Sequence, residues 1–138
     1  MIQRKQRVEV RRGFTLMEVL VVVAIIVVLA GIAAPIVLNR LEEAKVDRAR
    51  IDCKAISDAC SMYNLKNGDY PQSLDVLVQP PEGGGKPYLP ESALTDPWGK
   101  RYQLRTPGSH RENASMGRPD VFTVTKDGEE VGNWPKGQ

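Results

Sequence analysis

The segment from Arg11 to Glu18 carries the residues whose types and spacing point most directly to chemistry. Two arginines precede Gly13 and Phe14, and Glu18 then stands alone at the entrance of a long apolar stretch. A carboxylate carried into a bilayer costs about 2.5–3.5 kcal/mol on insertion scales, so it is expected to have a cationic partner. An ordinary membrane anchor has no use for an acid at this position, which indicates a function for Glu18.

The apolar stretch is long enough to cross a membrane. The 20 residues from Val19 to Leu38 contain no charged side chain, and as a helix they extend roughly 30 Å, the thickness of a bilayer's hydrocarbon core. Residues 1–13 contain five of the 19 basic residues and one of the 17 acidic ones. Such a positive segment stays in the cytoplasm, which places the C-terminal part of the chain on the other side of the membrane.

Two other interpretations of this charge and hydropathy pattern are less favoured. Outside residues 1–13, acidic side chains outnumber basic ones by 16 to 14, so we expect no nucleic-acid partner, because such proteins carry an excess of positive charge. A cleaved secretory signal peptide would use Gly31-Ile32-Ala33 as its small-residue cleavage site. Against it, Glu18 would begin the hydrophobic region for no reason, and the helical pattern continues well beyond that site.

Residues 39–67 are predicted to continue the helix with one apolar face and one charged face. The apolar face is predicted to contain Leu41, Ala44, Ile51, Ala55, Ala59 and Met62, widened by Ala49, Ile56 and Tyr63. Asn67-Gly68 predicts the end of the helix. Within the apolar half, Gly31 lowers helix propensity, and Pro35 removes a hydrogen bond and favours a kink. This Gly–Pro pair predicts either a static kink or a place where the helix bends during rearrangement.

Beyond Gly68 the chain becomes rich in loops and short strands. Residues 73–78 predict one helical turn with Ser73 as N-cap, and residues 79–90, with four prolines and three glycines, predict a loop. A type I turn is predicted at Asp96-Pro97-Trp98-Gly99. Strands are predicted at 100–106 and 120–126, followed by a turn at Asp127-Gly128 and a short segment at 131–134. The fold class is therefore α+β, a long helical stalk whose amphipathic half packs on a small antiparallel sheet.

The chain lacks the residue groups that catalysis requires, and we predict that it is not an enzyme. Its only histidine, His110, lies in the predicted 107–119 loop and is expected to be solvated. Cys53 and Cys60 are seven residues apart, so their Cα atoms are about 10 Å apart in a helix, too far for an intramolecular disulfide. Core packing is the favoured interpretation of both thiols. A bridge between neighbouring subunits and a reactive thiol are the alternatives.

The stretch GFTLMEVLVVVAIIVVLAGIAAP, residues 13–35, resembles the N-terminus of type IV pilins and pseudopilins. The resemblance implies that a prepilin peptidase cuts after Gly13 and methylates the new N-terminal residue, Phe14. It also implies that Glu18 meets the amine of a neighbouring subunit and sets the register of a growing filament, and that the helix kinks at Pro35.

The globular part narrows the resemblance to the major pseudopilins of type II secretion systems. The residues that carry it are Asn67-Gly68-Asp69-Tyr70-Pro71, Asp96-Pro97-Trp98-Gly99, Tyr102, Asp120-Val121-Phe122, Asp127-Gly128 and Gly132-Asn133-Trp134. The implied organisation is a cleaved cytoplasmic leader (1–13), a transmembrane and assembly half of the stalk (14–38), an amphipathic half (39–67) and a type IV pilin-like globular region (68–138).

The resemblance also implies a function and partners. The chain would be a structural subunit of a homo-oligomeric helical filament, held in the inner membrane by a single pass with its C-terminal domain in the periplasm. The filament would drive protein export across the outer membrane, and its partners would be minor pseudopilins, the prepilin peptidase and the inner-membrane secretion platform. The alternatives are a type IV pilus or DNA-uptake pseudopilus subunit, and a monomeric membrane-anchored extracytoplasmic binding domain that keeps Met1.

No cofactor is certain, although the resemblance implies a calcium site in an acid-rich loop before the Gly-Asn-Trp segment. Here that loop is short and lacks a run of aspartates. Asp127, Glu129, Glu130 and nearby carbonyls supply only part of the six to eight oxygens that calcium requires. A solvated turn is therefore the preferred interpretation, and a weak calcium site is the alternative.

Overall fold

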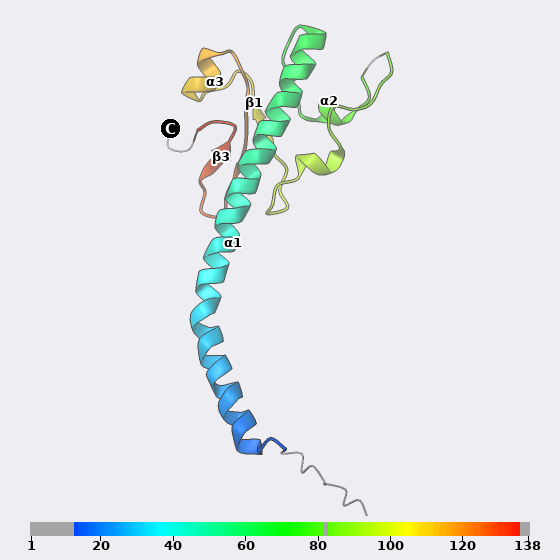
Figure 1. Cartoon of the computed structure of the whole chain (residues 1–138). Coiled ribbons are helices and arrows are strands. Elements are labelled where there is room, and N and C mark those ends of the chain that lie inside the picture. Colours follow the sequence, from blue (N-terminus) through cyan, green and yellow to red (C-terminus); the bar gives the residue numbers. More distant parts are fainter. Residues whose placement is uncertain (1–12, 82, 136–138) are drawn as a thin grey trace, which may run out of the picture. The chain divides into compact units, whose positions relative to one another are not determined.

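The computed structural model describes residues 13–81 and 83–135. The elements in chain order are α1 (Leu16–Asn67), α2 (Asp75–Val78), the 3-10 helix η1 (Glu91–Leu94), β1 (Gln103–Arg105), α3 (Arg111–Ser115), β2 (Asp120–Val124) and β3 (Glu130–Gly132) (Figure 1). The chain divides into two compact units, residues 1–39 and residues 40–138. The predicted α+β class, a long N-terminal helix with a small antiparallel sheet, is confirmed.

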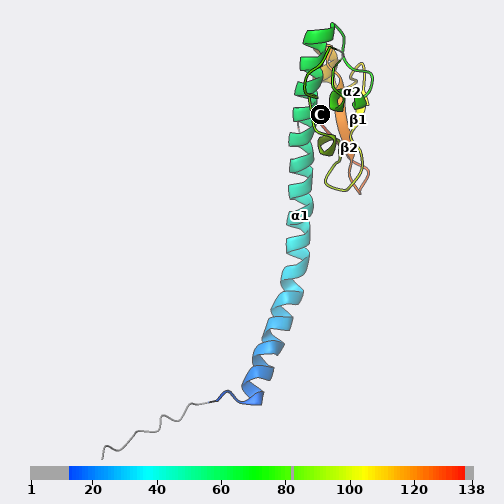
Figure 2. The same cartoon turned by 90° about the vertical axis from the view of Figure 1, so that its right-hand side faces the viewer.

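The sheet has three antiparallel strands in the order β1-β2-β3. Arg105 lies opposite Asp120 on β1 and β2, and Phe122 of the central strand lies opposite Gln103 on one side and Gly132 on the other. Within the second unit, the strands run beside the C-terminal half of α1 (Figure 2). The strands are shorter than predicted, because only three residues of β1 and three of β3 pair with β2.

The prediction of which face of α1 lies in the core is partly wrong. The buried residues are Ala49, Cys53, Ile56, Ala59 and Cys60 of α1, together with Leu74, Leu77, Leu94, Tyr102, Val121 and Val131. Five residues that were predicted to face the core are instead exposed, Ile51 by 66% and Met62 by 60%; the other three are Leu41, Ala44 and Ala55. This half of α1 carries two apolar stripes, and the globular region covers the one that contains Cys53, Ile56 and Cys60. Cys53, for example, donates to the Val131 carbonyl at 3.7 Å.

Two local expectations also needed correction, and two turns were predicted well. Leu74 rather than Ser73 is the N-cap of α2; the Ser73 hydroxyl accepts a hydrogen bond from the Asp75 N–H at 3.2 Å. The predicted 107–119 loop contains α3. The Asp96–Gly99 turn closes with a 3.0 Å bond from the Gly99 N–H to the Asp96 carbonyl. The turn at Asp127-Gly128 closes with a 3.2 Å bond from the Gly128 N–H to the Thr125 carbonyl.

The two thiols are free and buried, as expected from their shared helix face. Burial raises the pKa of Cys53 to about 12 and that of Cys60 to about 12. Because the thiolate is the reactive form, we expect both to react with iodoacetamide at pH 8 about tenfold or more slowly in the native chain than in guanidinium. Thiol labelling followed by mass spectrometry measures this. The control is Ser92→Cys, an exposed position, in a chain lacking both native cysteines. Equal native labelling at all three positions would contradict the packing assignment.

Candidate processing and assembly site

Glu18 lies in the first turn of α1, and its side chain closes the start of the helix on Thr15. The Thr15 backbone N–H and hydroxyl donate to Glu18 Oε2 at 2.8 and 3.1 Å. In return, the Glu18 N–H donates to Thr15 Oγ1 at 3.2 Å. This reciprocal arrangement is a capping box, which satisfies backbone donors that a helix start leaves unpaired. This capping box was not predicted from the sequence, although Thr-x-x-Glu before an apolar run is the signature of one.

The predicted cleavage position lies just outside this cap. Gly13 and Phe14 precede the first helical residue, Leu16, and both are exposed. Phe14 is 88% exposed, so nothing in the described part of the chain covers its side chain. The described part of the chain thus leaves both residues exposed, and cleavage between them stays a prediction. The leader itself, apart from Gly13, lies outside the described residues.

The apolar half of α1 exposes large hydrophobic side chains on all sides. It is long and apolar enough to cross a membrane, and none of its most apolar stretch is buried within the chain. Valine, leucine and isoleucine side chains from Val19 to Leu38 are about half exposed or more. Such a surface is stable only where lipid or other apolar helices cover it.

Gly31 and Pro35 lie within the continuous α1 helix. Pro35 has no N–H to donate to the Gly31 carbonyl, which removes one helical hydrogen bond. A Cβ added at Gly31 would meet no atom within 4 Å, so packing within the described chain does not demand glycine there. The kink at this pair stays a prediction.

The three acidic residues considered for calcium lie at the turn between β2 and β3. Asp127, Glu129 and Glu130 are all exposed, and Glu130 Oε1 accepts a hydrogen bond from an Arg105 N–H at 3.1 Å. Among residues 13–81 and 83–135, no three His, Cys, Asp or Glu side chains are grouped as a metal site. Of these three acids, Glu130 is paired with a basic side chain, that of Arg105.

A buried carboxylate, Asp120, organises the polar part of the globular unit. Its side chain is fully buried, and it accepts hydrogen bonds from the Ser109 N–H (2.7 Å), the Ser109 hydroxyl (3.1 Å) and the His110 N–H (3.1 Å). The Asn113 side-chain amide donates to its other oxygen at 2.8 Å. Burial alone raises the pKa of Asp120, but these hydrogen bonds together outweigh it and hold the pKa below its ordinary value. Asp120 therefore fastens the 107–119 segment to the sheet as a charged group.

The expectation of a solvated His110 is wrong. Its ring is half-buried and stacks on Trp134, with the ring centroids 3.5 Å apart and the planes at 14°. Gly132 makes room for the indole, because a Cβ at that position would overlap the Trp134 ring. No local signal placed His110 against Trp134, since the two residues meet only through the fold.

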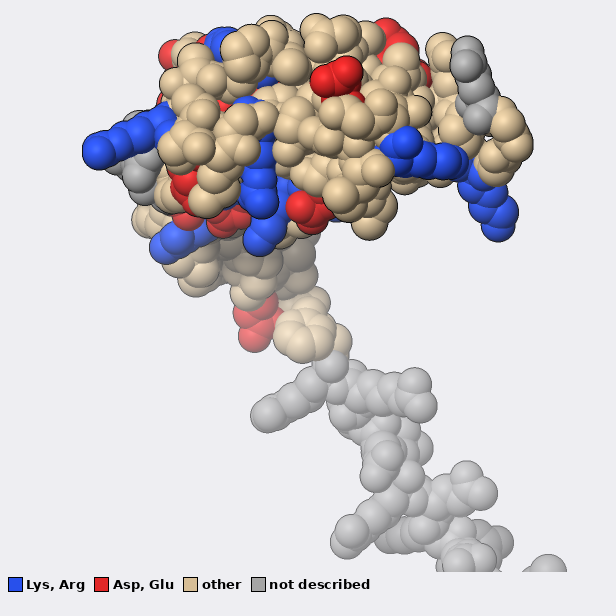
Figure 3. All heavy atoms as spheres, turned by 90° about the horizontal axis from the view of Figure 1, so that it is seen from above, with Lys and Arg blue, Asp and Glu red and all other residues tan. Residues whose placement is uncertain are grey.

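Charges of both signs are interspersed on the face of the molecule seen in Figure 3. Some of these charged side chains make hydrogen bonds or ion pairs that cross the globular unit. Glu42 on α1 accepts a hydrogen bond from the Trp98 indole at 3.0 Å, and this bond, with help from Lys45, lowers the pKa of Glu42. The pairing joins the Asp96–Gly99 turn to the helix.

Comparisons with known proteins match both parts of the chain. The model of the family described as type II secretion system (T2SS), protein G matches residues 36–135, and the prokaryotic N-terminal methylation motif matches residues 10–34. The type II secretion system core protein G of Pseudomonas aeruginosa is 38% identical over 151 residues, covering 96% of this chain and 99% of the relative. The core protein G of Vibrio cholerae is 39% identical over 142 residues, covering 88% and 90%.

One solved structure is also similar to this chain. The crystal structure of the major pseudopilin from the type 2 secretion system of enterohaemorrhagic Escherichia coli matches with a TM-score of 0.55 and 28% identity. The match covers 73% of this chain and 93% of that one. The resemblance inferred from residues 13–35 and from the globular blocks is thereby confirmed. One solved structure that the chain resembles is thus that of a pseudopilin, and the chain belongs to the type II secretion system protein G family.

Proposed function

We propose that this chain is a structural subunit of the type II secretion pseudopilus, a helical filament that assembles from the inner membrane and drives protein export across the outer membrane. The observation that carries the proposal is the match of the protein G family over residues 36–135 directly after the methylation motif at 10–34. The exposed apolar half of α1 supports it, because a filament core would cover that surface. The family is one of structural subunits, and we assign no catalysis to the chain.

Processing is the first step of the proposal. Hydrolysis of the Gly13–Phe14 bond by a prepilin peptidase would leave a carboxylate on Gly13 and a free amine on Phe14. The amine would then take a methyl group from a sulfonium methyl donor and release a proton. The exposed backbone ahead of the capping box supports this step. The new amine would stand two residues before the start of α1 and four residues before Glu18.

Assembly is the second step. Glu18 of one subunit would pair with the Phe14 amine of its neighbour, so that neither charge enters the apolar filament core without a partner. Identical subunits joined head to tail by a non-closing rotation form an open helix. Bending at Gly31 and Pro35 would accommodate the passage from bilayer to filament. Minor pseudopilins and the inner-membrane secretion platform are the proposed partners in this assembly.

The proposed topology is a single pass through the inner membrane with residues 40–138 in the periplasm. Its support is the positive charge of residues 1–13 ahead of the apolar span. A type IV pilus or DNA-uptake subunit shares the leader, but the protein G family match over the globular region favours type II secretion. A monomeric, anchored binding domain would keep its N-terminus intact.

The N-terminal mass of the purified chain tests the proposal. Expressed with a prepilin peptidase, the chain is expected to lose residues 1–13 and to carry one methyl group on Phe14. The matched control is Gly13→Val, whose branched side chain should block cleavage and leave the full-length chain in the membrane. An unprocessed wild-type chain beside an active peptidase would contradict processing and favour the anchored binding domain. Electron microscopy of the same cells then shows whether the processed chain forms filaments.

A further inference from the structure

We infer that the guanidinium of Arg105, rather than a calcium ion, holds the β2–β3 turn against the sheet in this chain, so that the globular unit needs no divalent cation there. The inference concerns what stabilises the fold and does not depend on the proposed filament function. It rests on four contacts of the Arg105 side chain and on the hydrogen bonds and ion pairs that the neighbouring acids already make.

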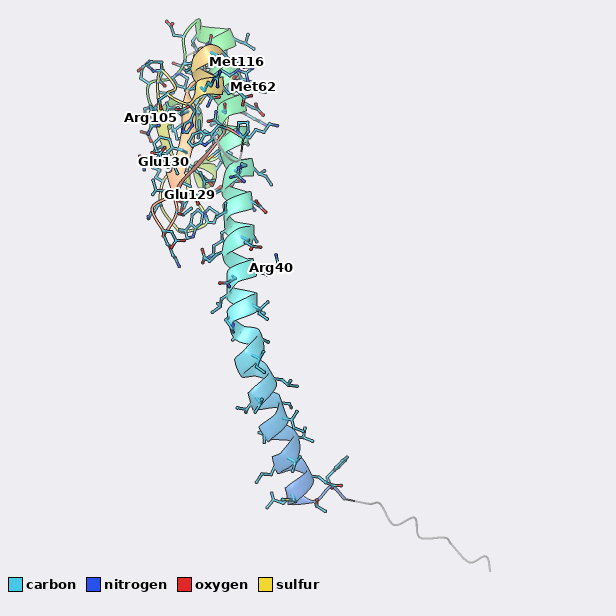
Figure 4. The ribbon with its side chains drawn as sticks, turned by 90° about the vertical axis from the view of Figure 1, so that its left-hand side faces the viewer. Arg40, Met62, Arg105, Met116, Glu129 and Glu130 are labelled. Atoms are coloured by element: carbon cyan, nitrogen blue, oxygen red, sulfur yellow. The ribbon has the colours of Figure 1, made fainter. Side chains whose placement is uncertain are left out.

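Arg105 connects segments that are far apart in the chain. Its Nη2 lies 3.1 Å from Glu130 Oε1 at the start of β3, and its Nη1 lies 3.6 Å from Asp120 Oδ2 at the start of β2. Nη1 also donates to the Ser109 hydroxyl at 3.1 Å. Figure 4 shows Arg105 and Glu130 side by side on the globular unit. One cation on the edge strand β1 thus contacts β2, β3 and the segment before α3.

The same side chain also packs on an aromatic ring. The Arg105 Cζ lies 4.4 Å from the centroid of the Phe122 ring, which is the geometry of a cation–π contact. A planar guanidinium can stack on a ring and donate to carboxylates with its edges at once, whereas an ammonium acts as a point charge and cannot do both. The site therefore suits arginine rather than a generic positive charge.

The acids near Arg105 do not fit calcium. Calcium requires six to eight oxygen ligands at 2.3–2.6 Å. Both Asp120 oxygens already accept hydrogen bonds from Ser109, His110 and Asn113, and Glu130 is paired with Arg105. In the part of the chain that the structure describes, no three potential metal-binding side chains are grouped. A divalent ion beside the guanidinium would in addition be repelled by it.

The test is thermal unfolding of the full chain in detergent micelles, followed by tryptophan fluorescence, in EDTA and in millimolar calcium. The wild-type Tm is expected to be the same in both within about 1 °C. Arg105→Gln is expected to lower Tm by about 5 °C or more in both solutions, given 4–8 °C per kcal/mol for a domain of this size. Arg105→Lys should recover only part of that loss.

Arg101→Gln is the matched control. Arg101 pairs with Asp75 and with Glu91 (3.2 Å), but it is more exposed than Arg105 and has no stacked ring, so a Tm loss below about 2 °C is expected. A wild-type Tm that rises by several degrees in calcium would overturn the inference. So would equal losses for Arg105→Gln and Arg101→Gln. Should Arg105→Gln not fold, Glu130→Gln replaces it; a Tm loss no larger than that of Arg101→Gln would then count against the inference.

Discussion

Glu18→Ala is expected to reduce filament assembly at least a hundredfold while leaving processing at Gly13 intact. In the proposed filament, the substitution leaves the amine of a neighbouring Phe14 without its partner in an apolar environment. Removing one partner of a buried ion pair costs about 3–5 kcal/mol, and each 1.4 kcal/mol corresponds to a factor of ten. Immunoblotting of sheared filaments measures assembly, and the intact mass of the membrane fraction verifies that Phe14 is exposed and methylated.

Glu18 also caps α1, so the experiment must separate this capping role from its proposed role in the ion pair with Phe14. Glu18→Gln keeps a side chain that can accept from the Thr15 N–H, since glutamine also serves in a capping box, but it has no charge. Thr15→Val removes the hydroxyl of the cap and keeps the charge of Glu18. We expect Glu18→Gln to fail in assembly and Thr15→Val to retain most of it. The reverse result would show that Glu18 acts by capping α1, and the ion-pair proposal would be rejected.

Asp120→Ala is expected to lower the free energy of unfolding by about 3–4 kcal/mol. The alanine leaves buried donors of Ser109, His110 and Asn113 without an acceptor, and each unsatisfied buried donor costs about 1–3 kcal/mol. Urea denaturation followed by tryptophan fluorescence measures the change. The control is Asp127→Ala, which removes an exposed aspartate near the neighbouring turn and is expected to change stability by less than about 0.5 kcal/mol. Similar values for the two variants would show that the Asp120 hydrogen bonds do not stabilise the fold.

The lowered pKa of Asp120 also predicts a pH dependence. An aspartate in the unfolded chain titrates near 3.9, and the hydrogen bonds hold the folded pKa of Asp120 below its ordinary value. The contribution of this group is therefore fully present above the unfolded pKa and is lost as the pH falls through the folded one. Urea denaturation between pH 6 and pH 3 should show a smaller acid-dependent loss in Asp120→Ala than in the wild type. Parallel curves would contradict the assignment.

Local chemistry accounts for what the sequence by itself determined. The Val19–Leu38 run needs only composition to be recognised as a membrane span. The end of α1 follows from Asn67-Gly68, where Gly68 has a φ of +89°, a conformation that glycine adopts without strain. The Asp96–Gly99 turn likewise depends on four adjacent residues. Such features are encoded by contiguous residues and do not depend on what packs against them.

Tertiary structure alone decided which stripe of α1 is buried and what surrounds Asp120. The sequence placed both Ile51 and Cys53 in the core, and only the fold shows that Cys53 packs against β3 while Ile51 is exposed. His110 was expected to be solvated because it lies in the predicted 107–119 loop, yet its ring stacks on that of Trp134, which is distant in sequence. Periodicity identifies the apolar stripes of a helix, but the stripe that is covered depends on where distant strands run. That choice is a matter of long-range packing, which adjacent residues do not specify.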